Sequence, residues 1–222
     1  MACGLLAKAK EVYATQALLR ATPRELNPAR LEAFSDGVLA VIITIMVLEL
    51  RPPRNDTLEE LRNLIPGLLI YLLSFTAISI FWVNHLHLLR ATRRISGAAM
   101  WANLHLLFWL SLVPVVTAWV GEQHARKWPT AIYGAVVFLA SIAYVLLTLT
   151  LRAANPDTRL NALLGRDTKA KVSLALYLLG ISLALVFVEP LGPLLAFGAY
   201  ALNSLIWFIP DRRFATSGNE PD

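Results

Sequence analysis

Hydrophobic residues along this chain fall into long blocks, and short polar or basic segments separate them. An α-helix rises about 1.5 Å per residue, so about 20 apolar residues cross the roughly 30 Å hydrocarbon core of a membrane. Six blocks approach or exceed this length. They predict membrane-spanning helices at about 34–50, 64–88, 100–120, 130–151, 172–188 and 194–209.

Composition agrees with this pattern. The chain is 57% hydrophobic and 16% charged, whereas a soluble domain carries roughly 25% charged residues. A soluble all-helical domain with very apolar core helices is the alternative, and the number of long blocks argues against it. We therefore predict an all-α, polytopic membrane protein with six transmembrane helices per subunit. Its predicted parts are a leader at 1–29, a six-helix transmembrane domain at 30–210 and a tail at 211–222.

Basic residues set the predicted orientation. Of the 20 lysines and arginines, 15 fall in the leader, the second and fourth loops and the tail, and 5 fall on the other side. Basic loops stay in the cytoplasm, so both termini are predicted there, in a protein of the cell membrane. The net charge of +5 indicates contacts with membrane lipids and does not indicate a nucleic-acid partner. Cys3 is the one cysteine, and we expect no disulfide framework, metal site or cofactor.

The first span has unusual ends. Within the segment Arg30–Arg51, the apolar run Val38–Leu48 has no ionisable side chain, and Thr44 is its one polar residue. Asp36 lies just before this run. A carboxylate at the start of a hydrophobic segment is costly in lipid, so we expect Asp36 to face protein or water and to have a partner. Arg30 is one candidate partner, and a cation from elsewhere in the bundle is another.

Helical spacing places four residues of this run on one stripe: Val41, Thr44, Ile45 and Leu48. If several copies of the helix surround an axis, the stripe makes rings of apolar side chains with one ring of hydroxyls. Apolar rings gate by dewetting, and hydroxyls contact a partly dehydrated cation. Plain packing in a bundle core explains the same stripe. The span is apolar all round, so its sequence does not select a face.

Two further clusters contain polar groups within apolar spans. Trp82 and His85 lie near the end of the second block. A buried histidine needs hydrogen-bond partners, which Asp36 or Ser35 would supply, and it serves either as a structural group or as a proton relay or pH-sensitive gate. The third block begins with Trp101, Asn103 and His105. These three residues either extend the same network or bond neighbouring helices and interfacial water.

The first and second spans carry a family resemblance. Arg30, Phe34, Ser35, Asp36 and Gly37 reproduce an RxxxFSDG signature, which continues through TIMVLEL, and the second span has a WxxH. In these motifs the chain resembles the endosomal and lysosomal potassium channel family and its prokaryotic relatives (transmembrane protein 175-like). The resemblance extends more weakly over the whole chain.

The resemblance implies a pore at the centre of a homotetramer, lined by the first helix of each subunit. It implies a hydrophobic constriction at Val41, apolar positions below it at Ile45 and Leu48, and a filter layer at Thr44. The family more often has isoleucine at the constriction. The signature and WxxH residues imply an assembly and gating network that braces the pore helices: Arg30, Phe34, Ser35, Asp36, Gly37, Trp82 and His85.

We predict passive conduction of potassium, and of other monovalent cations less well, through this pore. The potassium identity rests on the resemblance. The alternative is a proton-permeable or proton-coupled small-solute transporter that uses Asp36 and His85 as its relay. The first and second halves show no internal repeat, which weakens an inverted-repeat transporter. No nucleophile–base set or metalloprotease motif stands out, so an enzyme is not expected.

Overall fold

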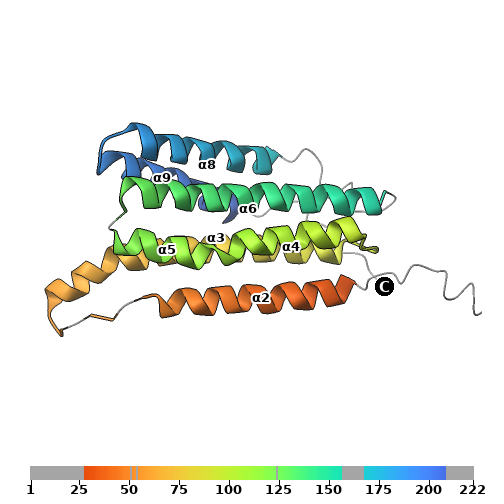
Figure 1. The fold of residues 1–222 in the computed structure, drawn as a ribbon, viewed down its shortest axis with the longest axis horizontal. Coiled ribbons are helices and arrows are strands. Elements are labelled where there is room, and N and C mark those ends of the chain that lie inside the picture. Colours follow the sequence, from red (N-terminus) through yellow and green to blue (C-terminus); the bar gives the residue numbers. More distant parts are fainter. Residues whose placement is uncertain (1–27, 51, 54, 124, 157–167, 209–222) are drawn as a thin grey trace, which may run out of the picture.

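The computed structural model describes residues 28–208 except 51, 54, 124 and 157–167. This part of the chain is an elongated helical bundle, shown in Figure 1. Its helices are α2 (Pro28–Leu48), α3 (Leu58–Arg90), α4 (Gly97–Ser111), α5 (Val113–Glu122), α6 (Lys127–Ala154), α8 (Thr168–Val186) and α9 (Leu191–Phe208).

The six predicted spans are confirmed. Each matches a helical segment of at least 18 residues that is apolar enough to cross a membrane, and α4 with α5 forms one such segment, Gly97–Glu122. The predicted spans 34–50 and 172–188 run two residues past the ends of α2 and α8. The observed helices extend past most of the predicted limits, most of all α3 with its 33 residues. The predicted tail and all but the last two residues of the predicted leader lie outside the described residues.

The third span is interrupted between α4 and α5 at Leu112. Pro114 lies in the first turn of α5. Proline has no backbone N–H, so Pro114 cannot donate to the carbonyl of Leu110, and its ring crowds the preceding turn. The span therefore continues as a second helix after one non-helical residue.

The helices form layers around α6. In Figure 1, α8 and α9 lie on one side of α6, α3 with α4 and α5 lies on the other, and α2 lies at the edge of the bundle. α2 contacts α3, α4 and α5. Close packing of α6, α8 and α9 depends on Gly134 and Gly180, because a Cβ at either position would overlap the ring of Tyr200.

Two side chains join helix ends that are distant in sequence. The Glu189 carboxylate accepts a hydrogen bond from the backbone N–H of Lys127 at 2.8 Å and so caps the start of α6. At the other end of α6, the Asn155 amide oxygen accepts from the backbone N–H groups of Arg93 and Arg94, at 3.1 and 2.9 Å. Asn155 thereby ties the connection between α3 and α4 to the end of α6.

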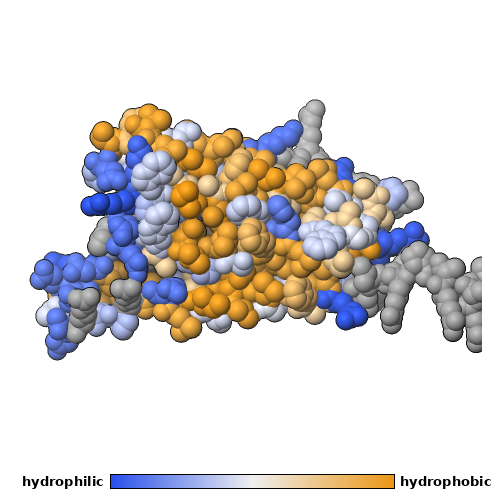
Figure 2. Space-filling model, viewed as in Figure 1, coloured by the Kyte–Doolittle hydropathy of each residue, from blue (hydrophilic) through white to orange (hydrophobic). Residues whose placement is uncertain are grey.

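The surface has the character of a membrane protein. Figure 2 shows a broad hydrophobic band over the visible face, with hydrophilic residues gathered at the two ends of the bundle. α9 runs toward the end of the bundle at which α2 starts (Figure 1), as an even number of spans requires. The chain is a multi-pass membrane protein.

Candidate functional site

α2 has two distinct faces. Ser35, Leu39, Ile42 and Met46 are its buried residues, and they recur at helical spacing on the side that packs against the bundle. The four predicted pore residues lie on the opposite side. Val41 is 55% exposed, Ile45 44% and Leu48 81%, and Thr44 is also exposed.

The structure therefore selects a face that the sequence did not. Core packing within one subunit does not account for Val41, Ile45 or Leu48, because the bundle leaves them uncovered. The Thr44 hydroxyl donates to the carbonyl of Val41 at 2.9 Å. The hydroxyl proton of Thr44 is thus bonded within α2, and the lone pairs of the hydroxyl oxygen remain available to a cation or water.

Three residues of the signature share this outward side or its edge. Phe34 and Gly37 are exposed, and so is Arg30. A Cβ added at Gly37 would meet no atom within 4 Å. Packing within the described chain therefore does not require a glycine at this position, and the structure does not bring Arg30, Phe34 or Gly37 into the network predicted for them.

The buried face of α2 is joined to α3 and α4 through Asn103. The Asn103 amide nitrogen donates to the Ser35 hydroxyl at 2.9 Å, and its amide oxygen lies 2.7 Å from Nε2 of His85. An amide oxygen only accepts hydrogen bonds, so His85 donates from Nε2. The Ser35 hydroxyl in turn donates to the carbonyl of Leu31 at 2.8 Å. Ser35, His85 and Asn103 are all buried, so these bonds form away from solvent.

The prediction that His85 bonds directly to Asp36 or Ser35 is wrong. His85 reaches Ser35 only through Asn103. The sequence offered Trp101, Asn103 and His105 as residues that could extend the network. Of these three, Asn103 alone joins it. His105 instead accepts a hydrogen bond from the Trp109 indole at 3.0 Å. The sequence signal for Asn103 is an amide within an apolar helix. Such an amide needs hydrogen-bond partners, but the sequence does not indicate which residues they are.

The predicted cationic partner of Asp36 is also wrong. The indole N–H of Trp82 donates to the Asp36 carboxylate at 2.9 Å, and within the described residues Arg30 makes no ion pair with Asp36. Six helical residues span one and two-thirds turns, so the side chains of Arg30 and Asp36 diverge by about 120°. At this end of the bundle Arg90 instead forms an ion pair with Glu32, at 3.7 Å.

Trp82 and His85 together fix how α2 is rotated. They lie one turn apart on α3, and they reach two consecutive residues of α2: Trp82 bonds Asp36, and His85 reaches Ser35 through Asn103. Two neighbouring side chains of a helix point about 100° apart. Holding both therefore fixes the direction in which the opposite face of α2 points.

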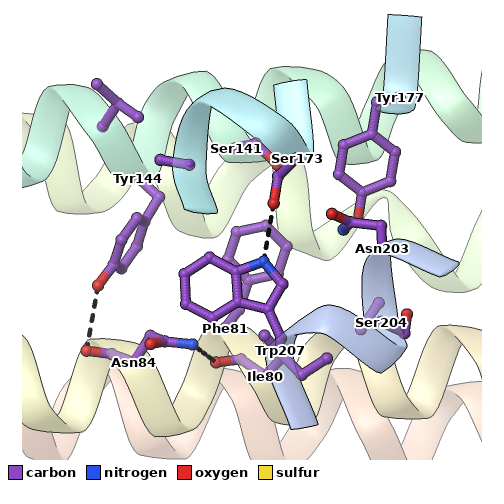
Figure 3. Close-up of a pocket in the computed structure, with 13 residues that line it drawn as sticks. Ile80, Phe81, Asn84, Ser141, Tyr144, Ser173, Tyr177, Asn203, Ser204 and Trp207 are labelled. Atoms are coloured by element: carbon purple, nitrogen blue, oxygen red, sulfur yellow. Dashed lines mark hydrogen bonds between the residues drawn. The ribbon is translucent and has the colours of Figure 1, made fainter. Parts of the chain in front are cut away.

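The small cavity in Figure 3 lies elsewhere, between α3, α6, α8 and α9. Its volume is about 40 Å³, and Phe81, Tyr144 and Trp207 are among the side chains around it. Trp207 donates to Ser173 at 2.8 Å, and Tyr144 donates to the carbonyl of Asn84 at 3.2 Å. No charged side chain lines this cavity and none of the predicted site residues reaches it.

A larger cavity of about 580 Å³ lies where α2 ends and α3 begins, next to α5. The carboxylates of Glu49, Glu60 and Glu122 line it, together with apolar residues and prolines. Three carboxylates thus gather at this end of α2, and carboxylates attract cations.

Comparisons with known proteins identify relatives of this chain. The sequence model of the family described as "Endosomal/lysosomal potassium channel TMEM175" matches residues 30–114. A potassium channel of Chryseobacterium sp. is 41% identical over 196 residues, which are 88% of this chain and 100% of that protein. A potassium channel of Streptomyces collinus is 32% identical over 183 residues, which are 78% of this chain and 89% of that one.

The fold has a close structural counterpart. It is similar to the crystal structure of a lysosomal potassium-selective channel TMEM175 homolog from Chamaesiphon minutus, with a TM-score of 0.70 and 26% identity. The similarity covers 84% of this chain and 97% of that one. Since one relative is matched over its whole length at 41% identity, the resemblance in the first span is confirmed, and the chain belongs to the TMEM175 family.

Proposed function

We propose that this chain is the subunit of a potassium-permeable cation channel, which conducts passively through a central pore lined by α2. One observation carries the proposal: Val41, Thr44, Ile45 and Leu48 lie together on the face of α2 that the subunit leaves uncovered. Relatives that are 41% and 32% identical are named potassium channels, which supports the choice of ion.

The pore needs several copies of the chain. α2 lies at the edge of the bundle, so a single subunit cannot surround the outward stripe. Closed rotational symmetry would set the stripes of several copies around one axis. We propose a homotetramer in the cell membrane, with both termini cytoplasmic because 15 of the 20 basic residues gather on that side.

In this arrangement Val41 forms the constriction, and Ile45 and Leu48 form further apolar rings. Helix carbonyls already accept i→i+4 hydrogen bonds, so the lining of α2 offers no cage of free backbone oxygens. Discrimination between ions therefore comes from the width of the apolar rings and the cost of removing water from the ion. The Thr44 hydroxyls supply the one layer of oxygen ligands, and their lone pairs are free for it.

The bonds from Trp82 and His85 would keep this stripe pointed at the axis. Loss of either bond lets α2 turn, which would replace the pore-facing rings with neighbouring side chains. Glu49, just after α2, and Glu60, in the first turn of α3, would draw cations toward the pore mouth.

The second candidate, a proton-permeable or proton-coupled transporter, is less well supported. Asp36 bonds an indole N–H and His85 bonds an amide oxygen, and no hydrogen bond joins Asp36 to His85. An indole donates its proton without exchanging it, so these contacts do not form a proton relay.

Potassium flux from liposomes tests the proposal, with sodium as the competing ion. Val41→Ala widens the narrowest ring, so we expect a higher leak and weaker selectivity for potassium. The matched control is Val47→Ala, because Val47 is also exposed but points about 120° away from Val41 around the helix. It should leave both quantities unchanged. Equal effects of the two variants would place the pore elsewhere, and flux that requires a pH gradient would favour the proton-coupled reading.

A further inference from the structure

The face of α4 that points away from the bundle carries a histidine. Trp101, His105 and Phe108 recur there at helical spacing, and Trp101 is 69% and Phe108 54% exposed. His105 is itself exposed. It lies eight residues after Gly97, the first residue of α4, and thus about 12 Å along the helix axis from that end. This position lies inside the segment Gly97–Glu122, which is apolar enough to cross a membrane.

One nitrogen of His105 lacks a partner in the described chain. The Trp109 indole donates to Nε2 of His105 at 3.0 Å, so the neutral ring carries its own proton on Nδ1. Among the described residues no acceptor bonds this Nδ1–H. Lipid tails offer no acceptor either, and ionisable side chains within a membrane normally face protein or a water-filled cavity. This face of α4 therefore requires a polar neighbour that the single subunit does not supply.

A second copy of the chain fits this requirement, by an argument that rests on the pore proposed above. α2 contacts α3 as well as α4, and its hydrogen bonds to them arise from the consecutive residues Asp36 and Ser35. If copies surround the outward stripe of α2, then α3 and α4 form the two flanks of each copy. Rotational symmetry places the α4 flank of one copy against the α3 flank of the next, as a head-to-tail contact.

The exposed flank of α3 is apolar and offers a hydroxyl at a suitable depth. Its exposed residues include Leu68, Leu72 and Phe75, and Ser79 follows one turn after Phe75. The Ser79 hydroxyl donates to the carbonyl of Phe75 at 2.8 Å, which leaves its oxygen free to accept.

Ser79 and His105 also lie at similar depths. α3 ends with Arg90 and α4 begins with Gly97 at the same end of the bundle. Ser79 lies eleven residues before Arg90, about 16 Å from that end. His105 lies about 12 Å from it, so the two differ by less than one helical turn of about 5.4 Å.

We propose that α4 of one copy packs on α3 of the next, with Trp101 and Phe108 against the apolar stripe of α3. At this contact the Nδ1–H of His105 donates to the Ser79 hydroxyl of the neighbouring copy. The partner of this surface is thus a second copy of the same chain.

Cysteine cross-linking in membranes tests the contact. In a Cys3→Ser background, His105→Cys and Ser79→Cys are combined and treated with a short bismaleimide. A head-to-tail ring predicts a ladder of covalent oligomers from the double variant and monomers from each single variant. The control pairs His105→Cys with Leu179→Cys, because Leu179 is exposed on α8, which lies on the other side of α6 from α4 (Figure 1). This pair should give monomers.

Three outcomes would overturn the contact: a ladder from the control pair, equal ladders from the single variants, or no ladder in a protein that elutes as an oligomer. Flux measured on the same samples separates this result from the pore proposal. If a ladder forms but Val41→Ala does not change flux, the contact between copies is supported and the pore is not lined by α2. If Val41→Ala changes flux but no ladder forms, the proposed contact is wrong and the pore proposal stands. A monomeric protein with no ladder and no effect of Val41→Ala would refute both proposals.

Discussion

At the scale of single residues, Asn103 is the junction of the buried network. It is the residue through which α2 and α3 are both bonded to α4, by way of Ser35 and His85. Both of its partners are buried, and a buried polar group that loses its partner costs about 1–3 kcal/mol. A single amide therefore supports two helix contacts at once.

Replacing this amide should destabilise the bundle measurably. Asn103→Ala leaves the Ser35 and His85 groups without these bonds, so we expect a loss of about 2 kcal/mol and a drop in Tm on the order of 5 °C in detergent. Asn84→Ala is the matched control, because the Asn84 amide only donates to the carbonyl of Ile80 in its own helix. The role assigned to Asn103 is wrong if both variants melt at the same temperature.

At the scale of elements, α2 is held at one end and uncovered along one side. Its hydrogen bonds to other helices come from the consecutive residues Ser35 and Asp36, near its start. Glu32, in the second turn of α2, also forms an ion pair with Arg90 of α3. After Asp36 the packed side is apolar, as at Leu39, Ile42 and Met46. Hydrogen bonds are directional whereas burial of apolar surface is not, so the bonds of Ser35 and Asp36 add a directional constraint on the rotation of the helix.

Removal of one polar contact should therefore affect conduction more than folding. Trp82→Phe keeps an aromatic ring and removes the N–H that donates to Asp36, a bond to a charged group worth about 1.5–3 kcal/mol. We expect potassium flux per assembled oligomer to fall several-fold. Trp207→Phe removes a comparable indole bond, to Ser173, that lies away from α2, and should leave this flux unchanged. Equal flux from the two variants would refute the orienting role of Trp82.

At the scale of the whole molecule, hydropathy marks the part of the bundle that crosses the membrane, and charge distinguishes its two ends. The hydrophobic band in Figure 2 lies between two hydrophilic ends. One end includes the connection between α3 and α4, which carries Arg93 and Arg94 and is tied to α6 by Asn155. The other end carries the carboxylates near the end of α2. The positive-inside rule predicts that the basic end lies in the cytoplasm, which would put the carboxylates near the end of α2 on the outer side.

Cysteine labelling of intact cells checks this orientation. In a Cys3→Ser background, Asp56→Cys lies between α2 and α3 and should react with a membrane-impermeant maleimide added outside. Arg93→Cys, which is also exposed, lies at the opposite end and should react only after the membrane is opened. The reverse pattern would invert the proposed topology.

The sequence by itself determined the six spans, because the length and hydropathy of an apolar block are local properties that membrane thickness constrains directly. It also determined the family, through a motif in the first span, and it drew attention to Asp36 and His85 as groups in need of partners. It could not name those partners. Trp82 and Asn103 meet Asp36 and Ser35 only because α3 and α4 pack beside α2.

Only the tertiary structure decided which face of α2 is uncovered. The helix is apolar all round, so periodicity leaves every rotation equally favourable in lipid, and the choice depends on contacts with helices distant in sequence. The packing of α2 against α3, α4 and α5 buries Leu39, Ile42 and Met46 and leaves Val41 and its stripe outside. The break at Leu112 has both a local and a tertiary aspect. Pro114 marks it in the sequence, because proline interrupts a helix, but only the structure shows that the span continues as the separate helix α5.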